Sequence, residues 1–306
     1  MEHDINGVPD PILQTAILRL LRTLAKGSAK ATEATSDILS QIATNTDSSK
    51  NAGNAILYEC ARTILDVESE KGLRQMAINQ LSKFLVSKDN NRRYVALNVM
   101  KKVAEHDTVI IGRHLNTIVA CLKDYDNTIR MRALELIYLL MNPDNVVMLT
   151  EKLIQLLTEL SVSSIQGTRN ALDSGSENLR QNLTTKLCTL VEKHAPSDDV
   201  ASRKWKLETF MKIITISGQF VREEVASIFI GLVTQSPELQ AEFTLKLFNA
   251  LRKFIPKPHL ITKLDTLVQV AVWCIGEFGD LIIGEQLDLA GGETLAVELT
   301  NQEVVR

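Results

Sequence analysis

Aromatic residues, glycine and proline are all scarce in this chain of 306 residues. Aromatic side chains make up 5% of the sequence against 45% hydrophobic residues in total, and there are 14 glycines and 7 prolines. A β-sandwich or barrel needs a turn residue about every ten positions, so these counts argue against an all-β fold. The apolar content comes mostly from Leu, Ile, Val and Ala, which favours helices. The length suffices for two average domains or for one extended array.

The chain also lacks a strong excess of charge of either sign. Its formal net charge is −3, with 34 basic and 37 acidic residues. Residues 285–306 hold five acids and one base, so residues 1–284 carry 33 basic and 32 acidic side chains. A neutral body does not supply the basic field that nucleic-acid binding usually requires. We therefore expect no nucleic-acid partner.

Cysteine pairs and long apolar runs are missing as well. The four cysteines lie at least 61 positions apart, so no CxxC zinc or redox pair exists, and buried reduced thiols in a cytosolic protein are expected. No apolar run reaches the ~20 residues that span a bilayer. The acidic start at Met1–Asp4 does not resemble a signal peptide. Any membrane contact is therefore expected to be peripheral.

Motifs for catalysis and metal binding are absent from the sequence. The glycines Gly276 and Gly279 are followed by an acid and not by the Lys-Ser/Thr pair of a phosphate loop, so a helix end is the better interpretation. His106 and His114 stand eight residues apart without the spacing of a zinc site. Ser174 lies in a polar segment and not in a GxSxG elbow. We expect no enzyme, no cofactor and no metal site.

Apolar residues recur with the helical period along most of the chain. Each of four clear stripes repeats at i, i+3 or i+4 and i+7, which predicts helices that turn these faces toward a core. The stripes consist of Leu13, Ala16, Ile17, Leu20, Leu21 and Leu24; Ile129, Ala133, Leu136, Ile137 and Leu140; Leu149, Leu153, Leu156, Leu157 and Leu160; and Val221, Val225, Ile228, Phe229 and Leu232. Short segments with proline separate the helices, and no strand is expected.

A short motif repeats within the helical pattern. An Arg is followed three positions later by a small or apolar residue and then by another apolar one, and its best copies begin at Arg93 and Arg130, 37 residues apart. Lys-Asp precedes both copies, with the acids Asp89 and Asp124. The Asp is expected to cap a helix, the Arg to reach carboxylates across the turn, and the Ala to allow close helix packing. The spacing predicts an all-α, HEAT/armadillo-like α-solenoid of antiparallel helix pairs. An irregular helical bundle is the alternative.

The same pattern suggests how the chain is organised. We expect one helical-repeat solenoid over residues 1–284, interrupted by a polar loop at 161–178. Residues 285–306 have weak periodicity, a Gly-Gly pair and an excess of acids, and are expected to form a flexible acidic tail.

One cluster of basic residues is a candidate binding surface. The residues concerned are Lys88, Arg92, Lys101 and Lys102, around one predicted helix. The cluster predicts contact with an acidic partner or a lipid headgroup, at about 1 kcal/mol per cation near an anionic surface. A solvated face interleaved with Asp89 and Glu105 is the alternative interpretation.

Several segments resemble the trunk of the large adaptins, most closely of the gamma type. They are Asp10–Arg22 (DPILQTAILRLLR), Gly53–Glu59 (GNAILYE), Asn91–Leu97 (NRRYVAL), Glu192–Pro196 (EKHAP) and Trp273–Leu281 (WCIGEFGDL). The resemblance covers residues 1 to about 284 in order, and residues 285–306 depart from the family pattern.

The resemblance implies a role in a clathrin-adaptor coat. Large adaptins are α-solenoids of heterotetrameric clathrin adaptors, so the implied partners are a beta-type large adaptin, a medium (mu-type) chain and a small (sigma-type) chain. The implied work is vesicle-mediated intracellular protein transport, with the protein in the cytoplasm and peripheral on Golgi and endosomal membranes and coated vesicles. The alternative function is a free-standing helical-repeat scaffold that binds another protein or peptide.

Overall fold

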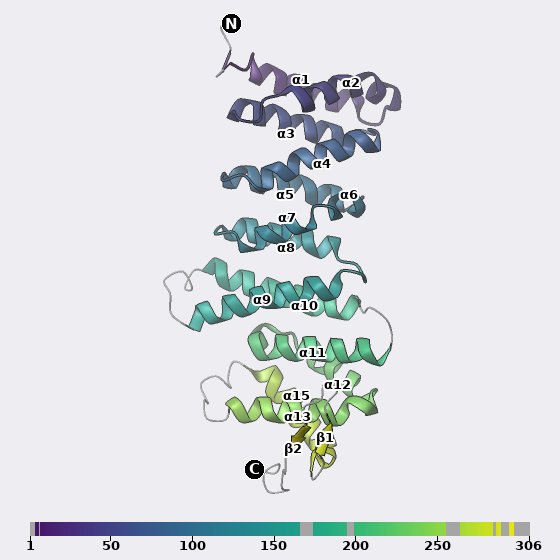
Figure 1. Ribbon diagram of the computed structural model, residues 1–306, viewed down its shortest axis with the longest axis vertical. Coiled ribbons are helices and arrows are strands. Elements are labelled where there is room, and N and C mark those ends of the chain that lie inside the picture. Colours follow the sequence, from purple (N-terminus) through teal and green to yellow (C-terminus); the bar gives the residue numbers. More distant parts are fainter. Residues whose placement is uncertain are drawn as a thin grey trace. The chain divides into compact units, whose positions relative to one another are not determined.

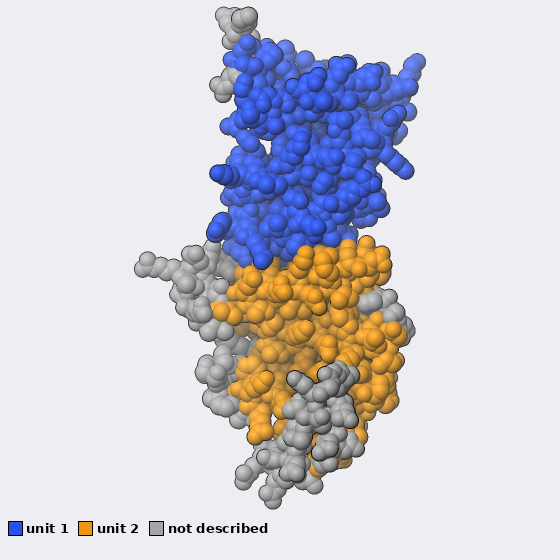
Figure 2. Space-filling view, viewed as in Figure 1, with its two compact units in different colours: residues 1–140 blue, residues 141–306 orange. Residues whose placement is uncertain are grey.

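The computed structural model divides into two compact units. Unit 1 comprises residues 1–140 and unit 2 residues 141–306 (Figure 2). The structure describes residues 4–5, 7–165, 174–194, 199–254, 264–283, 286–288 and 294–296. Each unit contains its own set of fully buried apolar side chains, such as Leu97 and Met100 in unit 1 and Phe229 and Phe243 in unit 2.

Unit 1 is built from helices that run back and forth in successive layers (Figure 1). The helices are α1 (Pro11–Ala25), α2 (Ala29–Asn45), α3 (Asn51–Asp66), α4 (Lys71–Leu85), α5 (Asn90–Ala104), α6 (Thr108–Gly112), α7 (Leu115–Ala120), the 3-10 turn η1 (Cys121–Lys123) and α8 (Asn127–Leu140). Helix α1 packs on α2 and α3, α3 on α4, α4 on α5, and α5 on α8. Each layer therefore buries its apolar face against the next layer.

Unit 2 is also built from helices. They are α9 (Val146–Ile165), α10 (Ser174–Lys193), α11 (Val200–Ser217), the 3-10 turn η3 (Gly218–Phe220), α12 (Glu223–Thr234), α13 (Pro237–Phe254), α15 (Asp265–Phe278) and the 3-10 turn η4 (Gly279–Ile282). Two strands follow, β1 (Gln286–Asp288) and β2 (Thr294–Ala296), which pair antiparallel with Leu287 opposite Leu295. Helices α9, α10 and α11 pack together, as do α12, α13 and α15.

The predicted all-α fold is confirmed, with two local corrections. The sequence pattern predicted no strand, whereas β1 and β2 form a short hairpin within the expected tail 285–306. Of the polar loop expected at 161–178, residues up to Ile165 belong to α9 and residues from Ser174 belong to α10. Residues 166–173 lie outside the described part of the chain. Among the described helices, none combines the length and the apolar character that a membrane crossing requires.

The repeated motif has a structural basis in unit 1. The small residues Ala77, Ala96 and Ala133 of its copies are at most 1% exposed, because they lie where α4, α5 and α8 pack against one another. A methyl group at these positions lets two helix backbones approach closely. Asp89 caps α5 as predicted, since its side chain accepts a hydrogen bond from the backbone N–H of Asn91 at 2.9 Å.

The second motif aspartate, Asp124, has a different role from the one predicted for it. The N–H of Thr128 in the first turn of α8 donates to Asp126 at 2.8 Å, so Asp126 caps that helix. Asp124 instead pairs with the motif arginine of the preceding repeat, Arg93. Arg93 Nε lies 2.7 Å from Asp124 Oδ2, and a terminal guanidinium nitrogen donates to Oδ1 at 3.2 Å. The predicted reach of the motif arginine to a carboxylate across the turn is therefore present.

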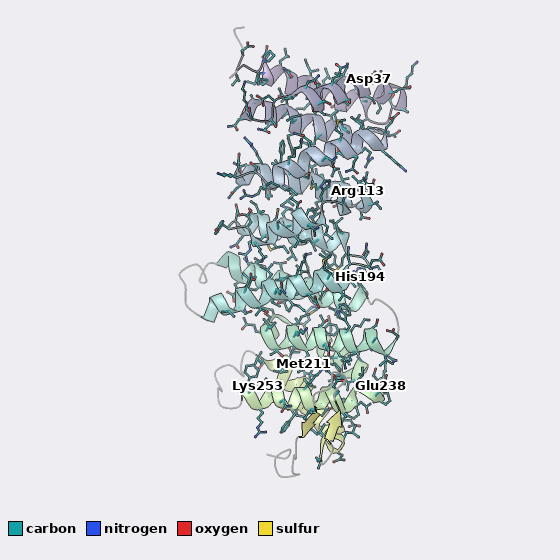
Figure 3. All side chains as sticks on the ribbon, in the orientation of Figure 1. Asp37, Arg113, His194, Met211, Glu238 and Lys253 are labelled. Carbon is teal, nitrogen blue, oxygen red and sulfur yellow. The ribbon has the colours of Figure 1, made fainter. Side chains whose placement is uncertain are left out.

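Polar contacts between successive layers repeat with nearly the same sequence separation. Tyr94 Oη accepts from Arg132 and Lys204 donates to Glu242, and in both pairs the partners are 38 residues apart. Arg113, labelled in Figure 3, donates to the side chain of Gln75, again across 38 positions. These separations agree with the 37-residue spacing read from the sequence. In these three places charged and polar side chains connect one helix pair to the next within a unit, in addition to the core.

Glycine is sterically required at the start of α3. A Cβ atom at Gly53 would lie 1.9 Å from the backbone carbonyl oxygen of Asp47. The close approach exists because Asn54 ties the turn before α3, donating from its side-chain amide to the carbonyl oxygens of Ser48 and Lys50 at 2.9 and 2.8 Å. The glycine therefore allows the α2–α3 turn to fold tightly over the first turn of α3.

Candidate functional site

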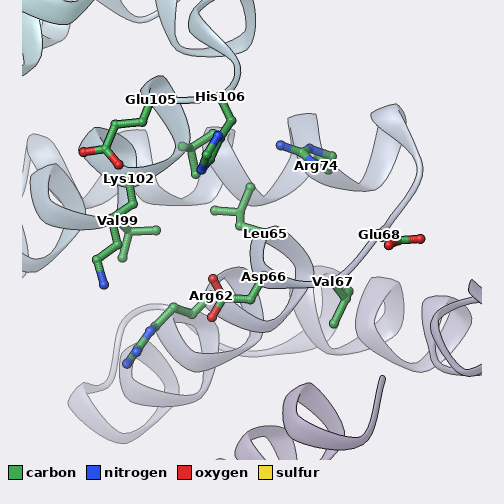
Figure 4. Close-up of a pocket in the computed structure, with 11 residues that line it drawn as sticks. Arg62, Leu65, Asp66, Val67, Glu68, Arg74, Val99, Lys102, Glu105 and His106 are labelled. Carbon is green, nitrogen blue, oxygen red and sulfur yellow. The ribbon is translucent and has the colours of Figure 1, made fainter. Parts of the chain in front are cut away.

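A polar groove of about 530 Å³ opens on one side of unit 1 (Figure 4). It lies between the last turn of α3, the turn that follows it, the start of α4 and the last turn of α5. The residues that line it are Arg62, Leu65, Asp66, Val67, Glu68, Arg74, Val99, Lys102, Val103, Glu105 and His106. The groove is therefore formed where three successive helices end or begin on the same side of the repeat.

The groove presents charges of both signs. Its cations are Arg62, Arg74 and Lys102, and the structure gives none of them an ion-pair partner among the described residues. The Nε atom of Arg74 is buried and has no hydrogen-bond acceptor there. Of the three carboxylates, only Asp66 has an ion-pair partner within the described part of the chain, Arg22 Nε at 3.6 Å. Such a lining suits a polar segment of another protein better than an apolar small molecule.

The structure does not bring the four predicted basic residues together. Lys88 precedes α5 and Lys102 lies in its last turn, so the helix separates them by about 20 Å at 1.5 Å per residue. Arg92 pairs with Asp89 at 3.6 Å and donates to the side chain of Asn51. Lys101 pairs with Glu135 at 2.8 Å. Only Lys102 lines the groove, so binding of an acidic partner or headgroup by the four together remains a prediction.

Lys101 belongs to a charged network between α5 and α8. Glu135 accepts from Lys101 at 2.8 Å and from Arg132 at 2.7 Å, and Arg132 also donates to the Tyr94 hydroxyl at 3.1 Å. Burial acts to raise the pKa of Glu135, but the two cations outweigh it and the pKa lies below its usual value. This network holds two layers of unit 1 together, which explains why the basic residue Lys101 is not free to meet a ligand.

The thiols and histidines form no site in the described part of the chain. All four cysteines are free and buried, and burial raises the pKa of Cys60 and of Cys188 to about 12. His114 contacts the side chain of Asn79 at 3.1 Å, and desolvation lowers its pKa. No group of three or more His, Cys, Asp or Glu side chains within the described residues is arranged to hold a metal ion.

Helix α1 presents an apolar face that no described residue covers. The helical pattern predicted that Leu13, Ile17, Leu20 and Leu24 face a core. The prediction is wrong for these four residues, which are 53, 46, 57 and 65% exposed. The buried side of α1 consists of Pro11, Leu18 and Ala25. We call the four exposed residues the α1 stripe. This surface was missed because α1 is apolar on two sides, and periodicity alone does not tell which side is covered.

The arginines of α1 lie away from this stripe. Arg19 and Arg22 both donate to Glu59 Oε1 of α3, at 3.2 and 2.8 Å. The Glu59 side chain is only 3% exposed, so this carboxylate anchors α1 to α3 from the buried side. Arg22 is 16% exposed and Arg19 is 66% exposed, so the α1 stripe itself is uncharged although Arg19 reaches solvent beside it.

Comparisons with known proteins identify relatives of the chain over nearly its whole length. The family described as the adaptin N terminal region matches residues 2–300. The gamma subunit of the AP-1 complex from Dictyostelium discoideum is 43% identical over 305 residues, which is 99% of this chain and 31% of that protein. Subunit gamma-1 from Mycosarcoma maydis is 45% identical and the human gamma-like 2 subunit 37% identical, each over 92% of this chain.

The chain spans about a third of the length of these curated relatives. A structural likeness supports the fold: a homology model of the full-length AP-3 complex in an intermediate open conformation matches with a TM-score of 0.62 at 19% identity, covering 89% of this chain and 48% of that chain. Because the matched family region extends over residues 2–300, this chain belongs to the family of proteins that share the adaptin N-terminal region.

Proposed function

We propose that this chain is a structural, non-enzymatic subunit of a clathrin-adaptor-type coat complex and acts as a protein-interaction scaffold in vesicle-mediated intracellular transport. The observation that carries the proposal is the 43% identity to an AP-1 gamma subunit over 99% of this chain. Identity at this level over the length of this chain supports a shared helical-repeat geometry.

The structure supports a scaffold role through the nature of its surfaces. Stacked helix pairs give extended faces suited to protein partners. Unit 1 offers a groove lined by both signs of charge and an uncharged apolar stripe on α1. Both kinds of surface suit recognition of folded proteins, which pair charges at the rim and bury apolar groups at the centre of an interface.

The partners that follow from this proposal are those of an adaptor heterotetramer. They are a beta-type large adaptin, a medium mu-type chain and a small sigma-type chain. The chain would then act in the cytoplasm and reach Golgi or endosomal membranes and coated vesicles peripherally, through the assembled complex. The sequences of the AP-1 gamma relatives support this assignment.

Co-expression tests the proposal directly. The full chain, carrying an affinity tag, is expressed together with the beta-type, medium and small chains and purified through its tag. We expect the beta-type and small chains to co-elute with it as one species in gel filtration. Recovery of neither chain at micromolar concentrations would contradict the assembly role and leave the free-standing scaffold as the better interpretation.

Two variants of the chain form a matched pair of controls. They test whether capture of the partner chains requires a folded unit 1 or reflects non-specific binding. Leu97→Asp places a carboxylate at a position in α5 that is 0% exposed, so unit 1 should unfold and lose the partners. Val109→Asp makes a similar change in α6 at a position that is 74% exposed, and should retain them. Equal recovery with both variants would show that the captured chains bind without a folded unit 1.

A further inference from the structure

Two arginines of unit 1 have no partner within the part of the chain that the structure describes, and both line the polar groove. Unit 1 contains nine arginines, and seven of them donate to a side chain or a carbonyl oxygen, as Arg22 donates to Glu59. The exceptions are Arg62 of α3 and Arg74 of α4, both of which are half-buried. A guanidinium group has five N–H donors, and buried donors are ordinarily satisfied. The groove therefore holds two guanidinium groups that lack an acceptor.

The cations of the groove gather at its two ends, with apolar side chains between them. In Figure 4 the side chains of Arg62 and Lys102 extend toward the same end, whereas Arg74 extends toward His106 at the other end. Leu65 lies between these two groups. The apolar part of the lining also includes Val67, Val99 and Val103. The groove thus presents positive charge, then an apolar strip, then positive charge.

The carboxylates of the groove do not neutralise these cations. Asp66 is paired with Arg22, 3.6 Å away, and not with a cation of the groove. Glu68 and Glu105 are exposed, and Figure 4 places them at opposite edges of the groove. Exposed carboxylates remain hydrated and are screened by salt. An anionic group that enters the groove between its edges therefore meets unpaired cations.

We propose that the groove binds an acidic segment of another protein in which acidic side chains stand on both sides of an aliphatic one. One carboxylate lies between Arg62 and Lys102, the second lies at Arg74, and the aliphatic side chain packs on Leu65. Hydrogen bonds from a guanidinium group to a carboxylate are among the strong ones, because Arg donates two parallel N–H groups. The volume of about 530 Å³ is that of a pocket for a small ligand, so it holds a few side chains and not a folded domain.

The apolar strip and the acidic edges favour a peptide over other anions. A lipid surface presents many negative charges in one plane, which Glu68 and Glu105 at the edges of the groove repel. A free phosphate ion gains nothing from the aliphatic side chains that separate the two groups of cations. Only a chain that alternates acidic and aliphatic side chains is complementary to both ends and to the strip between them.

Fluorescence anisotropy of a labelled peptide mixed with the full chain tests the proposal. The probe has the sequence Gly-Glu-Glu-Leu-Glu-Glu-Gly, and we expect saturable binding that weakens as salt is added. Arg62→Met and Arg74→Met should each raise the dissociation constant about tenfold, because each removes hydrogen bonds to a carboxylate. Neither variant breaks a contact between described residues, so both should keep the wild-type urea midpoint.

Two lysines at opposite ends of α5 provide a matched pair of variants. Lys102 lines the groove and Lys88 does not, and both side chains are exposed. Lys102→Met should weaken binding of the peptide, whereas Lys88→Met should leave it unchanged although the net charge falls equally. An equal effect of the two substitutions would show that the peptide responds to the overall charge of the protein and not to the groove.

A charge reversal tests the position of the peptide. Arg62→Glu combined with Lys102→Glu reverses the charge at one end of the groove and should abolish binding of the acidic peptide. This variant should bind one of two further peptides, in which the glutamates on a single side of the leucine are replaced by lysine. Replacement of the central leucine by serine should weaken binding to the wild-type chain, since the apolar contact is lost.

Four results would overturn the proposal. They are the absence of saturable binding, an unchanged dissociation constant in both arginine variants, and equal binding of the two lysine-containing peptides to the reversed groove. The fourth is displacement of the peptide by an equal concentration of inorganic phosphate or by phosphatidylserine vesicles, because the groove then recognises an anion or a lipid surface. Co-expression with the adaptor chains does not involve this peptide, so it reports the proposed adaptor function separately.

Discussion

Breaking the largely buried ion pair between Arg93 and Asp124 should destabilise unit 1 far more than breaking the more exposed pair between Arg92 and Asp89. Arg93 and Asp124 side chains are 14 and 9% exposed, whereas Arg92 and Asp89, paired one residue earlier in α5, are 27 and 46% exposed. Arg93→Met also removes hydrogen bonds to the Ser87 carbonyl and the Asn90 side chain, and Arg92→Met removes one to Asn51, so a variant that also replaces Asp124 is needed to isolate the unpaired carboxylate. Both variants keep the aliphatic part of the arginine side chain.

The magnitude follows from what each carboxylate retains. After Arg93→Met, Asp124 keeps one hydrogen bond, from the backbone N–H of Asp126 at 3.0 Å, and remains buried, so we expect a loss of about 3 kcal/mol in the free energy of unfolding. Arg92→Met exposes Asp89 to water and should cost less than about 1 kcal/mol. Replacing both members of the buried pair, as Arg93→Met with Asp124→Leu, should recover most of the loss.

Urea denaturation followed by far-UV circular dichroism measures these differences. The midpoint should fall for Arg93→Met at an unchanged slope, and the double substitution should move it back toward the wild type. The reasoning is refuted if Arg93→Met and Arg92→Met have the same midpoint. It is refuted equally if the double variant is as unstable as Arg93→Met, because the loss would then come from packing and not from an unpaired carboxylate.

Three further predictions concern other parts of the chain. Gly53→Ala should lower the free energy of unfolding by about 1–3 kcal/mol, because its Cβ would lie 1.9 Å from a carbonyl oxygen. Gly72→Ala in α4, whose Cβ would have no atom within 4 Å, should raise the free energy of unfolding by up to ~1 kcal/mol. Urea denaturation midpoints compare the two variants. Burial acts to raise the pKa of Glu242, but Lys246 and Lys204 outweigh it and hold the pKa below 4.5. The ionised Glu242 therefore contributes to the free energy of unfolding near neutral pH, and this contribution should be lost as the pH falls through the lowered pKa. Glu242→Gln should flatten this acid limb in thermal melts between pH 3 and 6, about the range in which a carboxylate titrates. The Cys60 thiol, with its pKa raised to about 12, should react with a thiol reagent at neutral pH only after unfolding, and fast reaction of the native protein would contradict its burial.

The repeat in the sequence predicted the fold well because its spacing reflects the contacts between neighbouring helix pairs. The 37-residue spacing of Arg93 and Arg130 corresponds to polar contacts such as Lys204–Glu242, whose partners are 38 residues apart. The motif alanines, for example Ala96 and Ala133, are fully buried. These features depend only on the local sequence and on the next repeat, so the pattern of residues along the sequence is enough to predict them.

Features that depend on what lies across a surface could not be predicted in the same way. The leucines of α1 and those of α8 have the same helical period, yet Leu20 is 57% exposed and Leu136 is 0% exposed. Periodicity indicates that a face is apolar, and only the structure shows whether another element covers it. The short hairpin of β1 and β2 was missed for a related reason, since three-residue strands leave no measurable alternation in the sequence.

The four basic residues of the predicted surface lie apart in the structure for a reason of geometry. Lys88, Arg92, Lys101 and Lys102 are close in sequence, but α5 places its ends about 20 Å apart. The carboxylate that neutralises Lys101 is Glu135, 34 residues further along the chain. Counting charges along the sequence does not reveal an ion-pair partner that is distant in the sequence. The groove that contains Lys102 depends equally on residues of α3 and α4, which no local pattern connects.

The division of the chain at Leu140 also separates its chromophores. Both tryptophans, Trp205 and Trp273, belong to unit 2, and all four tyrosines, from Tyr58 to Tyr138, belong to unit 1. Tryptophan emission of the unlabelled protein therefore reports on unit 2 alone. Unfolding of unit 2 can be followed in the wild-type chain by this signal, while far-UV circular dichroism follows the helices of both units in the same sample.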